Sequence, residues 1–137
     1  KSEERLQQIR SLFDLDGITV FSDRGNRLVC RNGNYMAEAP DGRPGFEDEG
    51  YLSLFGDDDI FVESNMIKLR SQNPAAYAVA QEQEIGAALQ CLSRKEGIPY
   101  TMVNFEVFNR NRKWSDEDVT LLTLLGHCIG DLLNYSE

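Results

Sequence analysis

The chain has 137 residues, of which 41% are hydrophobic, and a formal net charge of −9 at pH 7. This length fits one domain with a sizeable core, and no apolar run reaches the roughly 18 residues that a transmembrane helix needs. Nucleic acids and anionic membranes attract basic surfaces, so the acidic balance argues against both as partners. Residues 1–137 are therefore expected to form a single cytoplasmic domain.

The three cysteines (Cys30, Cys91 and Cys128) are widely spaced and have apolar neighbours. A disulfide scaffold or a zinc site needs closer pairs or a repeated spacing, so we expect buried free thiols and no metal or resident cofactor. His127 is the only histidine and has only Asp131 at helical ligand spacing. We expect its side chain to be interfacial or partly exposed.

The N-terminal part predicts a helix followed by a hairpin. Residues 1–13 place apolar side chains at helical spacing, and because no stop signal precedes them, we expect this helix to continue from an earlier segment of a larger multidomain protein. Two β-branched and aromatic runs, 18–21 and 27–31, flank a polar turn and predict a β-hairpin. The Pro-, Gly- and acid-rich segment 38–50 is expected to be a surface loop.

The middle of the chain predicts one strand and two short helices. Residues 60–63 form the strand, and the three aspartates at 57–59 lack the ligand spacing of a calcium loop, so we interpret them as a solvated turn. One helix is predicted at 65–71. Asn73 and Pro74 supply the cap and first-turn proline of the next helix, which is expected to run to about residue 84.

Two long strands are predicted at 87–93 and 100–108. Side chains of the second strand alternate between the two faces of a sheet. One set is suited to packing under helices: Thr101, Val103, Phe105 and Val107. The other set is too polar for a plain core and should face solvent or a wet cavity: Met102, Asn104 and Glu106.

The C-terminal segment 115–133 predicts a strongly amphipathic helix. Ser115 is a good N-cap, and the acidic residues 116–118 suit the positive end of the helix dipole. The apolar arc that follows is wider than one sheet face needs. We therefore expect this helix to pack on its own domain with one side and on a second copy of the chain with the other.

This order of elements predicts an α+β domain, with an antiparallel sheet and terminal helices covering one face of it. The C-terminal half moreover resembles GAF domains, the small ligand-sensing modules of signalling proteins. The resemblance is carried over residues 84–133 by the segments I-G-A-A-L-Q-C-L-S, K-E-G, T-M-V-N-F-E-V-F and R-K-W-S-D-E-D-V-T-L-L-T-L-L. The stretch L-F-G-D-D-D-I-F-V-E-S-N is similar to GAF domains attached to bacterial diguanylate cyclases.

The resemblance implies a PAS-related sheet of about six strands, with terminal helices on one face and mid-chain helices and loops over a small-molecule pocket on the other. It also implies a homodimer through the terminal helices, which pass ligand occupancy to an output domain such as a diguanylate cyclase. The candidate interface residues are Leu6, Ile9, Leu121, Leu124, Cys128 and Leu132. The residues that strand parity and element order place at this pocket are Phe55, Phe61, Glu63, Tyr77, Gln90, Met102, Asn104 and Glu106.

Two familiar GAF ligands are disfavoured by departures from the family patterns. The N-K…F…D-E pattern of cyclic-nucleotide-binding members is not recognisable in this sequence. Bilin-binding members attach the pigment through a Cys that is usually followed by His, whereas here the order is His127-Cys128 on the terminal helix. The ligand therefore remains unidentified at this stage.

Two other functions stay open beside the non-catalytic sensor. Some stand-alone GAF proteins reduce free methionine sulfoxide, but this chemistry needs an accessible thiolate with a lowered pKa and a resolving Cys nearby. The cysteines here lie in mid-strand and mid-helix positions, which suit packing. The other alternative is a dimerisation or interaction module that binds no ligand, in which the polar residues of the pocket floor pair with one another.

Overall fold

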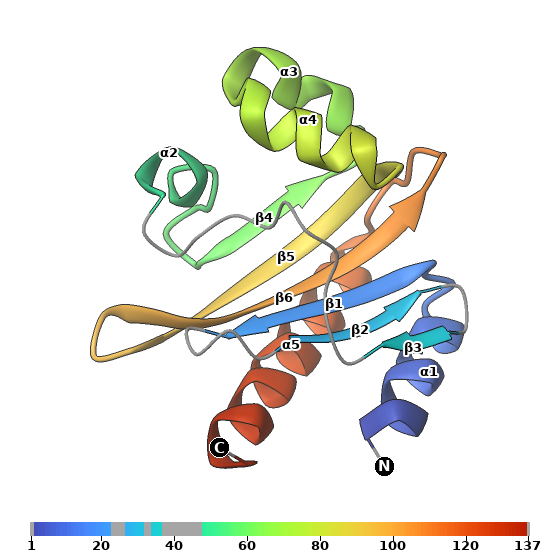
Figure 1. Cartoon of the computed structure of the whole chain (residues 1–137), viewed down its shortest axis with the longest axis vertical. Coiled ribbons are helices and arrows are strands. Elements are labelled where there is room, and N and C mark those ends of the chain that lie inside the picture. Colours follow the sequence, from blue (N-terminus) through green and yellow to red (C-terminus); the bar gives the residue numbers. More distant parts are fainter. Residues whose placement is uncertain (1, 23–26, 32–33, 37–47, 137) are drawn as a thin grey trace.

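The computed structural model describes residues 2–22, 27–31, 34–36 and 48–136. Within these ranges the chain forms a six-stranded antiparallel sheet with helices on both faces (Figure 1). The elements in chain order are α1 (Ser2–Leu12), β1 (Gly17–Ser22), β2 (Arg27–Arg31), β3 (Asn34–Met36), α2 (Glu49–Leu52), β4 (Ile60–Glu63), the 3₁₀ turn η1 (Met66–Lys68), α3 (Leu69–Gln72), α4 (Pro74–Glu82), β5 (Ile85–Lys95), β6 (Ile98–Phe108) and α5 (Asp116–Ser136).

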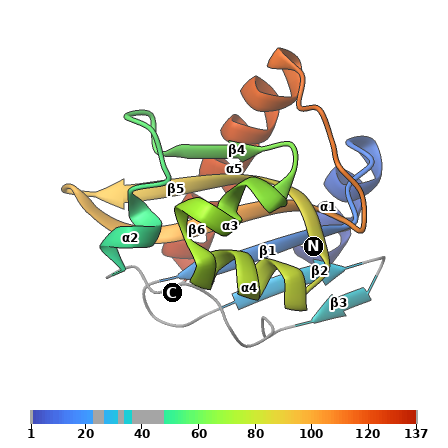
Figure 2. The ribbon, with the colours of Figure 1, turned by 90° about the horizontal axis from the view of Figure 1, so that it is seen from above.

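The strand order in the sheet is β3-β2-β1-β6-β5-β4. The two longest strands, β5 and β6, form a hairpin near the centre, and β6 also pairs with β1. Helices α1 and α5 cover one face of the sheet, while α2, α3 and α4 lie over the other (Figure 2). The predicted α+β class, the antiparallel sheet of about six strands and the placement of the terminal helices are confirmed.

Several predicted boundaries needed correction. Strand β3 and helix α2 were not predicted, because each is so short that tertiary contacts, rather than sequence periodicity, fix its conformation. Strands β5 and β6 extend past the predicted 87–93 and 100–108, since the charged end of β5 pairs with the start of β6 at an exposed hairpin tip, Lys95 opposite Ile98. The predicted loop at 38–50 lies mostly outside the described residues, and its last two residues belong to α2.

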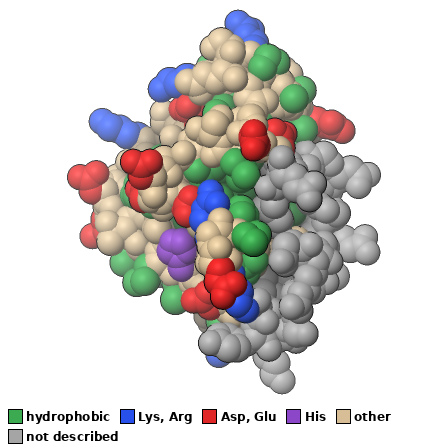
Figure 3. Space-filling model, turned by 90° about the vertical axis from the view of Figure 1, so that its left-hand side faces the viewer, with side chains coloured by type: hydrophobic (Ala, Val, Ile, Leu, Met, Phe, Trp, Pro, Cys, Tyr) green, Lys and Arg blue, Asp and Glu red, His purple; other side chains and the backbone are tan. Residues whose placement is uncertain are grey.

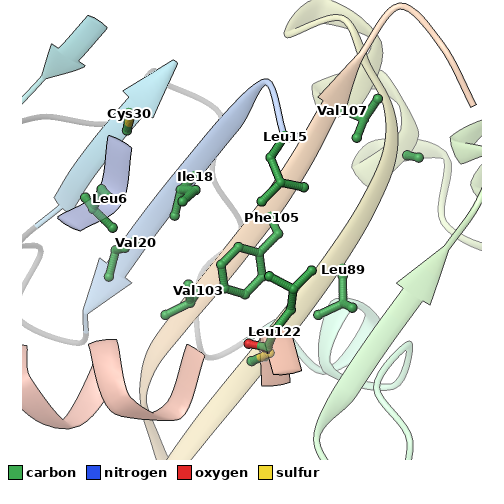
Figure 4. Packing of buried hydrophobic residues seen from close by; sticks show 12 residues of the cluster. Leu6, Leu15, Ile18, Val20, Cys30, Leu89, Val103, Phe105, Val107 and Leu122 are labelled. Atoms are coloured by element: carbon green, nitrogen blue, oxygen red, sulfur yellow. Dashed lines mark hydrogen bonds between the residues drawn. The ribbon is translucent and has the colours of Figure 1, made fainter. Parts of the chain in front are cut away.

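The face under α1 and α5 is a dry apolar core. Phe105 of β6 is fully buried at its centre, among aliphatic side chains from β1, β5 and the two helices (Figure 4). The predicted alternation of β6 is confirmed, because Val103 and Val107 join the same cluster. Close contact with α5 depends on Gly126, where an added Cβ would lie 2.9 Å from Cys91 Sγ.

The start of α5 is fixed by hydrogen bonds at the predicted cap. The Asp118 backbone N–H donates to Ser115 Oγ at 3.0 Å, and the Ser115 N–H donates to Asp118 Oδ2 at 3.2 Å. Just before the cap, the Trp114 indole N–H donates to the Glu63 carbonyl oxygen at 3.0 Å. The Arg112 guanidinium stacks over the Trp114 ring at 4.6 Å. These contacts tie the entry of α5 to the edge strand β4.

Two side-chain predictions on the terminal helices are wrong. Leu6 was predicted to face a second subunit but is only 3% exposed in the core. Cys128 was predicted to be a buried thiol, yet it is exposed. Helical periodicity explains the second result, since Leu122, Leu125 and Ile129 face the sheet and Cys128 therefore points away from it.

The described surface mixes charges of both signs. On the face shown in Figure 3, red and blue side chains are interspersed, and the described part of that face carries no continuous basic area. His127 is half-buried, and its Nδ1 lies 3.0 Å from Ser93 Oγ. Among the described helices, none is long and apolar enough to cross a membrane.

Candidate functional site

The face of the sheet opposite α1 and α5 carries a row of buried polar side chains. Gln90 of β5 lies directly opposite Asn104 of β6, and Asn104 lies opposite Thr19 of β1. All three are at most 6% exposed. Polar groups at such depth need hydrogen-bond partners, so this row is the part of the sheet where ligand chemistry is expected.

The next row contains a buried ion pair that crosses a strand. Arg31 of β2 and Glu106 of β6 flank Gly17 of β1. Because Gly17 has no side chain, Arg31 Nη2 reaches Glu106 Oε1 at 3.4 Å; a Cβ on Gly17 would lie 2.9 Å from that oxygen. Thr19 donates to the same oxygen at 3.1 Å.

The environment of Glu106 shifts its titration. Burial raises the pKa of its carboxyl from 4.5 to about 7, although the Arg31 charge and the Thr19 hydrogen bond oppose the shift. Arg31 is itself held in place, since Nη2 donates to Gln83 Oε1 at 2.7 Å and the guanidinium stacks over the Phe108 ring at 4.8 Å. Glu106 therefore changes charge near neutral pH inside the fold.

Helix α4 supplies the opposite wall. The side chain of Asn73 caps it by accepting from the Ala76 N–H at 3.0 Å, and Pro74 occupies the first turn, as predicted. The side of α4 that faces the sheet carries small residues such as Ala76 and Ala80. Small side chains opposite a polar floor leave a gap, and the result is a cavity of about 240 Å³.

The cavity has an apolar wall and a polar floor. Its apolar lining includes Phe21, Met66, Leu69, Val79, Ala80 and Ile85. Its polar lining includes Asp48, Tyr51, Gln83, Gln90, Asn104 and Glu106. A concave apolar site with a few convergent polar groups is the usual form of a small-molecule binding site.

Two polar groups of the cavity floor differ in their hydrogen bonding. The Tyr51 hydroxyl donates to Gln90 Oε1, and burial raises the pKa of the phenol, so Tyr51 stays protonated. Asn104 is 5% exposed, and its Oδ1 is buried without a hydrogen-bond partner among the described residues. Tyr51 and Gln90 thus bond to each other, whereas Asn104 Oδ1 has an unused acceptor position at the cavity.

The structure brings three of the eight predicted pocket residues together at this cavity: Gln90, Asn104 and Glu106. Met102 is 1% exposed and belongs to the apolar cluster of this face. Tyr77 borders a different groove beside Gly86.

The remaining predicted residues lie in or near β4 and do not line the cavity themselves, although Phe61 pairs in the sheet with Gln90, which does. The Phe55 ring packs against Tyr51 and Phe61, with centroids 5.8 and 6.1 Å apart. The Glu63 carboxylate accepts from the Asn65 N–H at 3.2 Å and lies 3.7 Å from Lys68 Nζ. These contacts give the three residues structural partners at the sheet edge.

Sequence reasoning missed Tyr51 and Asp48 as lining residues, and on the expected wall of mid-chain helices it chose Tyr77 instead of the small residues of α4 that line the cavity. Tyr51 and Asp48 belong to or border an acidic segment that was interpreted as a loop, and only tertiary contacts reveal their position. The α4 wall had a signal, because the run P-A-A-Y-A-V-A is rich in small residues. Facing a sheet, such a run leaves space that larger side chains would fill.

The cysteines lie away from the cavity. Cys30 and Cys91 are buried in the core on the other face, and burial raises the pKa of the Cys91 thiol to about 12. Cys128 is exposed on α5. Among the described residues, no cluster of three or more His, Cys, Asp or Glu side chains is arranged to hold a metal ion.

Comparison with solved structures places this architecture among known folds. The chain is similar to the red-light-absorbing state of NpR6012g4, a red/green cyanobacteriochrome, with 16% identity and a TM-score of 0.67 over 98% of this chain and 92% of that one. It is also similar to the Thermosynechococcus elongatus PixJ GAF domain in its blue-light-absorbing form, with 11% identity and a TM-score of 0.67 over 98% and 88% of the two chains.

A third similar structure is the GAF domain region of a Geobacter sulfurreducens protein, with 13% identity and a TM-score of 0.62 over 98% of this chain and 91% of that one. No protein-family model and no curated protein sequence matches this chain. The shared arrangement covers nearly the whole chain, so it has the GAF fold, as its sequence predicted.

Proposed function

We propose that this GAF-fold chain is a non-catalytic, small-molecule-sensing regulatory domain of a bacterial signalling protein. The observation that carries the proposal is the cavity of about 240 Å³ between α4 and the polar floor of the sheet. It contains a buried, unpaired Asn104 oxygen, and the terminal helices lie on the opposite face of the same strands. The proposed ligand site and the terminal helices are thus separated only by the sheet.

Strand β6 provides a direct route between the two faces. Asn104 and Glu106 line the cavity, while the alternating Val103, Phe105 and Val107 pack in the core with Leu122 of α5. A ligand that shifts β6 therefore changes packing under α5. The outer ends of α1 and α5 lie toward the same side of the molecule (Figure 1), where an output domain such as a diguanylate cyclase would receive the change.

Helix α5 also supports the proposal of a homodimer. Its side away from the sheet exposes Leu121 (40%), Leu124 (61%) and Leu132 (58%), together with Cys128. These positions recur at spacings of three and four residues, the pattern by which two helices pack along a seam. Ile9 of α1 is half-buried against the core and would contribute at the margin of such a contact.

The positions of the cysteines support a non-catalytic, non-bilin reading. A thiol-dependent reductase needs an activated thiolate at the pocket, yet Cys30 and Cys91 are buried on the other face and burial raises the pKa of Cys91. Covalent bilin attachment also needs a cysteine at the pocket. Cys128 lies on α5, across the sheet from the cavity.

A thermal-shift screen of a metabolite library tests the proposal. Hits should raise the melting temperature of the wild type. They should not raise that of Ala76→Phe, whose larger side chain fills the cavity. Ala78→Phe on the exposed side of α4 is the matched control and should respond like the wild type. A library without hits would favour the interaction module, and hits that shift all three proteins alike would place the site elsewhere.

Coupling to the terminal helices needs a second measurement. Hydrogen exchange of α5 amides should change when a hit from the screen saturates the wild type, because the ligand alters packing under that helix. The same experiment in the protein that contains the neighbouring domain should show changed output activity. If a bound hit leaves α5 exchange, helix pairing and output unchanged, ligand binding is not transmitted by this route.

A further inference from the structure

The charges around the cavity disfavour an anionic ligand. Two carboxylates, Asp48 and Glu106, belong to the lining, and none of the described lining residues is Lys or Arg. An anion would lose its hydration on entry and meet these groups without a cation among the described lining residues to compensate. A neutral or cationic ligand does not carry this penalty.

Arg31, the cation behind Glu106, is already engaged. Its Nη2 donates to Gln83 and lies against Glu106 Oε1, and its guanidinium stacks on Phe108. Recruiting it to a phosphate or carboxylate ligand would leave Glu106 without its partner in a buried position. Arg31 Nε has no hydrogen-bond partner among the described residues, but Arg31 does not belong to the cavity lining, so its guanidinium is not presented to an anion there.

The remaining polar groups of the floor call for hydrogen-bond donors. Asn104 Oδ1 is buried and has no partner among the described residues, so a ligand N–H would satisfy it. Among the described residues, both partners of the Glu106 carboxylate bind Oε1, which leaves Oε2 for a ligand. Gln90 Oε1 already accepts from Tyr51. Two acceptor oxygens on adjacent positions of one strand face suit a ligand edge with two donors.

The size of the cavity limits the ligand further. About 240 Å³ lies below the roughly 300–1,000 Å³ of sites for drug-sized ligands. The apolar wall formed by Met66, Leu69 and Val79 faces the polar floor, so a flat molecule can place its ring against the wall and its polar edge on the floor. A single ring with one polar substituent matches this division.

We propose, on the basis of the sensory function proposed above, that the cavity binds a compact, flat N–H donor of the amide or amidine class, neutral or cationic. Asn104 and Glu106 receive its N–H groups. Carboxylates and phosphates are rejected because the lining presents acceptors and negative charge to them. Specificity thus comes from donor pairing on the floor and from charge exclusion.

Three matched probes test this class directly: benzamidinium, benzamide and benzoate. They share one phenyl ring and a planar substituent, and differ in donors and charge. Titration into the ¹⁵N-labelled 137-residue chain, followed by NMR shifts of β5, β6 and α4 amides, gives each dissociation constant. Benzamide and benzamidinium should bind roughly tenfold or more tightly than benzoate, since benzoate offers no N–H donor.

The outcomes separate this inference from the broader function. If benzoate binds as tightly as the other two probes, the ligand class is wrong while a cavity for small molecules remains. If none of the three shifts the cavity amides, the ligand class is wrong, and the sensory proposal is decided separately by the metabolite screen described above. The ranking is measured on the wild type, so it does not depend on whether any variant folds.

Two variants then assign the donors to their partners. Asn104→Leu, similar in size but without an amide, should weaken benzamide binding roughly tenfold. Glu106→Gln should weaken benzamidinium more than benzamide, because only the former loses a charge partner. Glu82→Gln on the exposed side of α4 is the control and should change neither. Equal effects of Glu106→Gln on both probes would overturn the assignment of Glu106 to the cationic group.

Discussion

The two faces of this sheet are built from the same strands but differ in the polarity of their buried side chains. Toward α1 and α5, β6 presents Val103, Phe105 and Val107, which are at most 1% exposed and packed among aliphatic side chains. Toward α4 it presents Asn104 and Glu106, equally buried but polar. One strand thereby separates an apolar core from a buried polar floor by residue parity alone.

The difference between the faces shows which buried groups lower the stability of the fold. The dry face is a mostly apolar cluster, and Thr101 Oγ1 is buried beside α5 without a partner among the described residues. The other face keeps a carboxyl with a raised pKa and an unpaired amide oxygen, both of which are unfavourable in a folded protein. Local departures of this kind are expected at functional sites. The comparison predicts that changes on the two faces alter stability in opposite directions.

The largest effect is expected from removing the centre of the dry core. Phe105→Ala deletes a fully buried ring and leaves a cavity among close-packed neighbours. It should lower the free energy of unfolding by about 3–5 kcal/mol, measured by urea denaturation. A loss below about 1 kcal/mol would mean that this face is loosely packed and that the contrast between the faces is false.

The next effect depends on pH and comes from Glu106. Its folded pKa of about 7 lies above the ordinary value of 4.5, so the folded state holds the proton more tightly. The wild type should therefore lose about 3 kcal/mol of unfolding free energy as pH rises from about 4.5 to above 7. Glu106→Gln cannot ionise, and its stability relative to the wild type should rise over the same range.

Urea denaturation of both proteins at several pH values measures this difference. Glu82→Gln on the exposed side of α4 serves as the control and should follow the wild type. A difference between Glu106→Gln and the wild type that stays constant from pH 4.5 to 8 would show that Glu106 is not the titrating group. Burial of the Glu106 carboxyl would then lower the free energy of unfolding by less than its raised pKa implies.

A smaller effect, of opposite sign, is expected from Asn104→Leu. In the wild type, the buried Asn104 amide has an oxygen without a partner among the described residues. The variant has an apolar side chain of similar size in its place. It should raise the free energy of unfolding by about 1 kcal/mol in the absence of ligand. Thermal and urea denaturation report the change. A loss of stability similar to that of Phe105→Ala would mean that Asn104 is a structural residue.

The sequence was sufficient for the parts of the fold that have a periodic signal. The alternation of β6, the Ser115 cap of α5 and the Asn73-Pro74 start of α4 are all local patterns, and each is confirmed. The candidate floor residues followed from the same alternation, since parity places Gln90, Asn104 and Glu106 on one face once the fold class is known.

The rest of the site depends on contacts that no local pattern encodes. Arg31 and Glu106 are separated by 75 positions in the sequence and meet only because Gly17 lies between their strands. Tyr51 reaches Gln90 across 39 positions. Such features follow from packing in three dimensions and were therefore missed or misassigned.

The smallest effect on stability is expected on the side of α5 that points away from the sheet. Leu124 is 61% exposed, so Leu124→Ala should change the unfolding free energy of the isolated chain by less than about 0.5 kcal/mol. If this surface is the seam of a homodimer, the same variant should weaken self-association in analytical ultracentrifugation, whereas the exposed Ile98→Ala at the β5–β6 hairpin should not. A wild-type chain that stays monomeric at high concentration would show that this side of α5 is not a dimer seam.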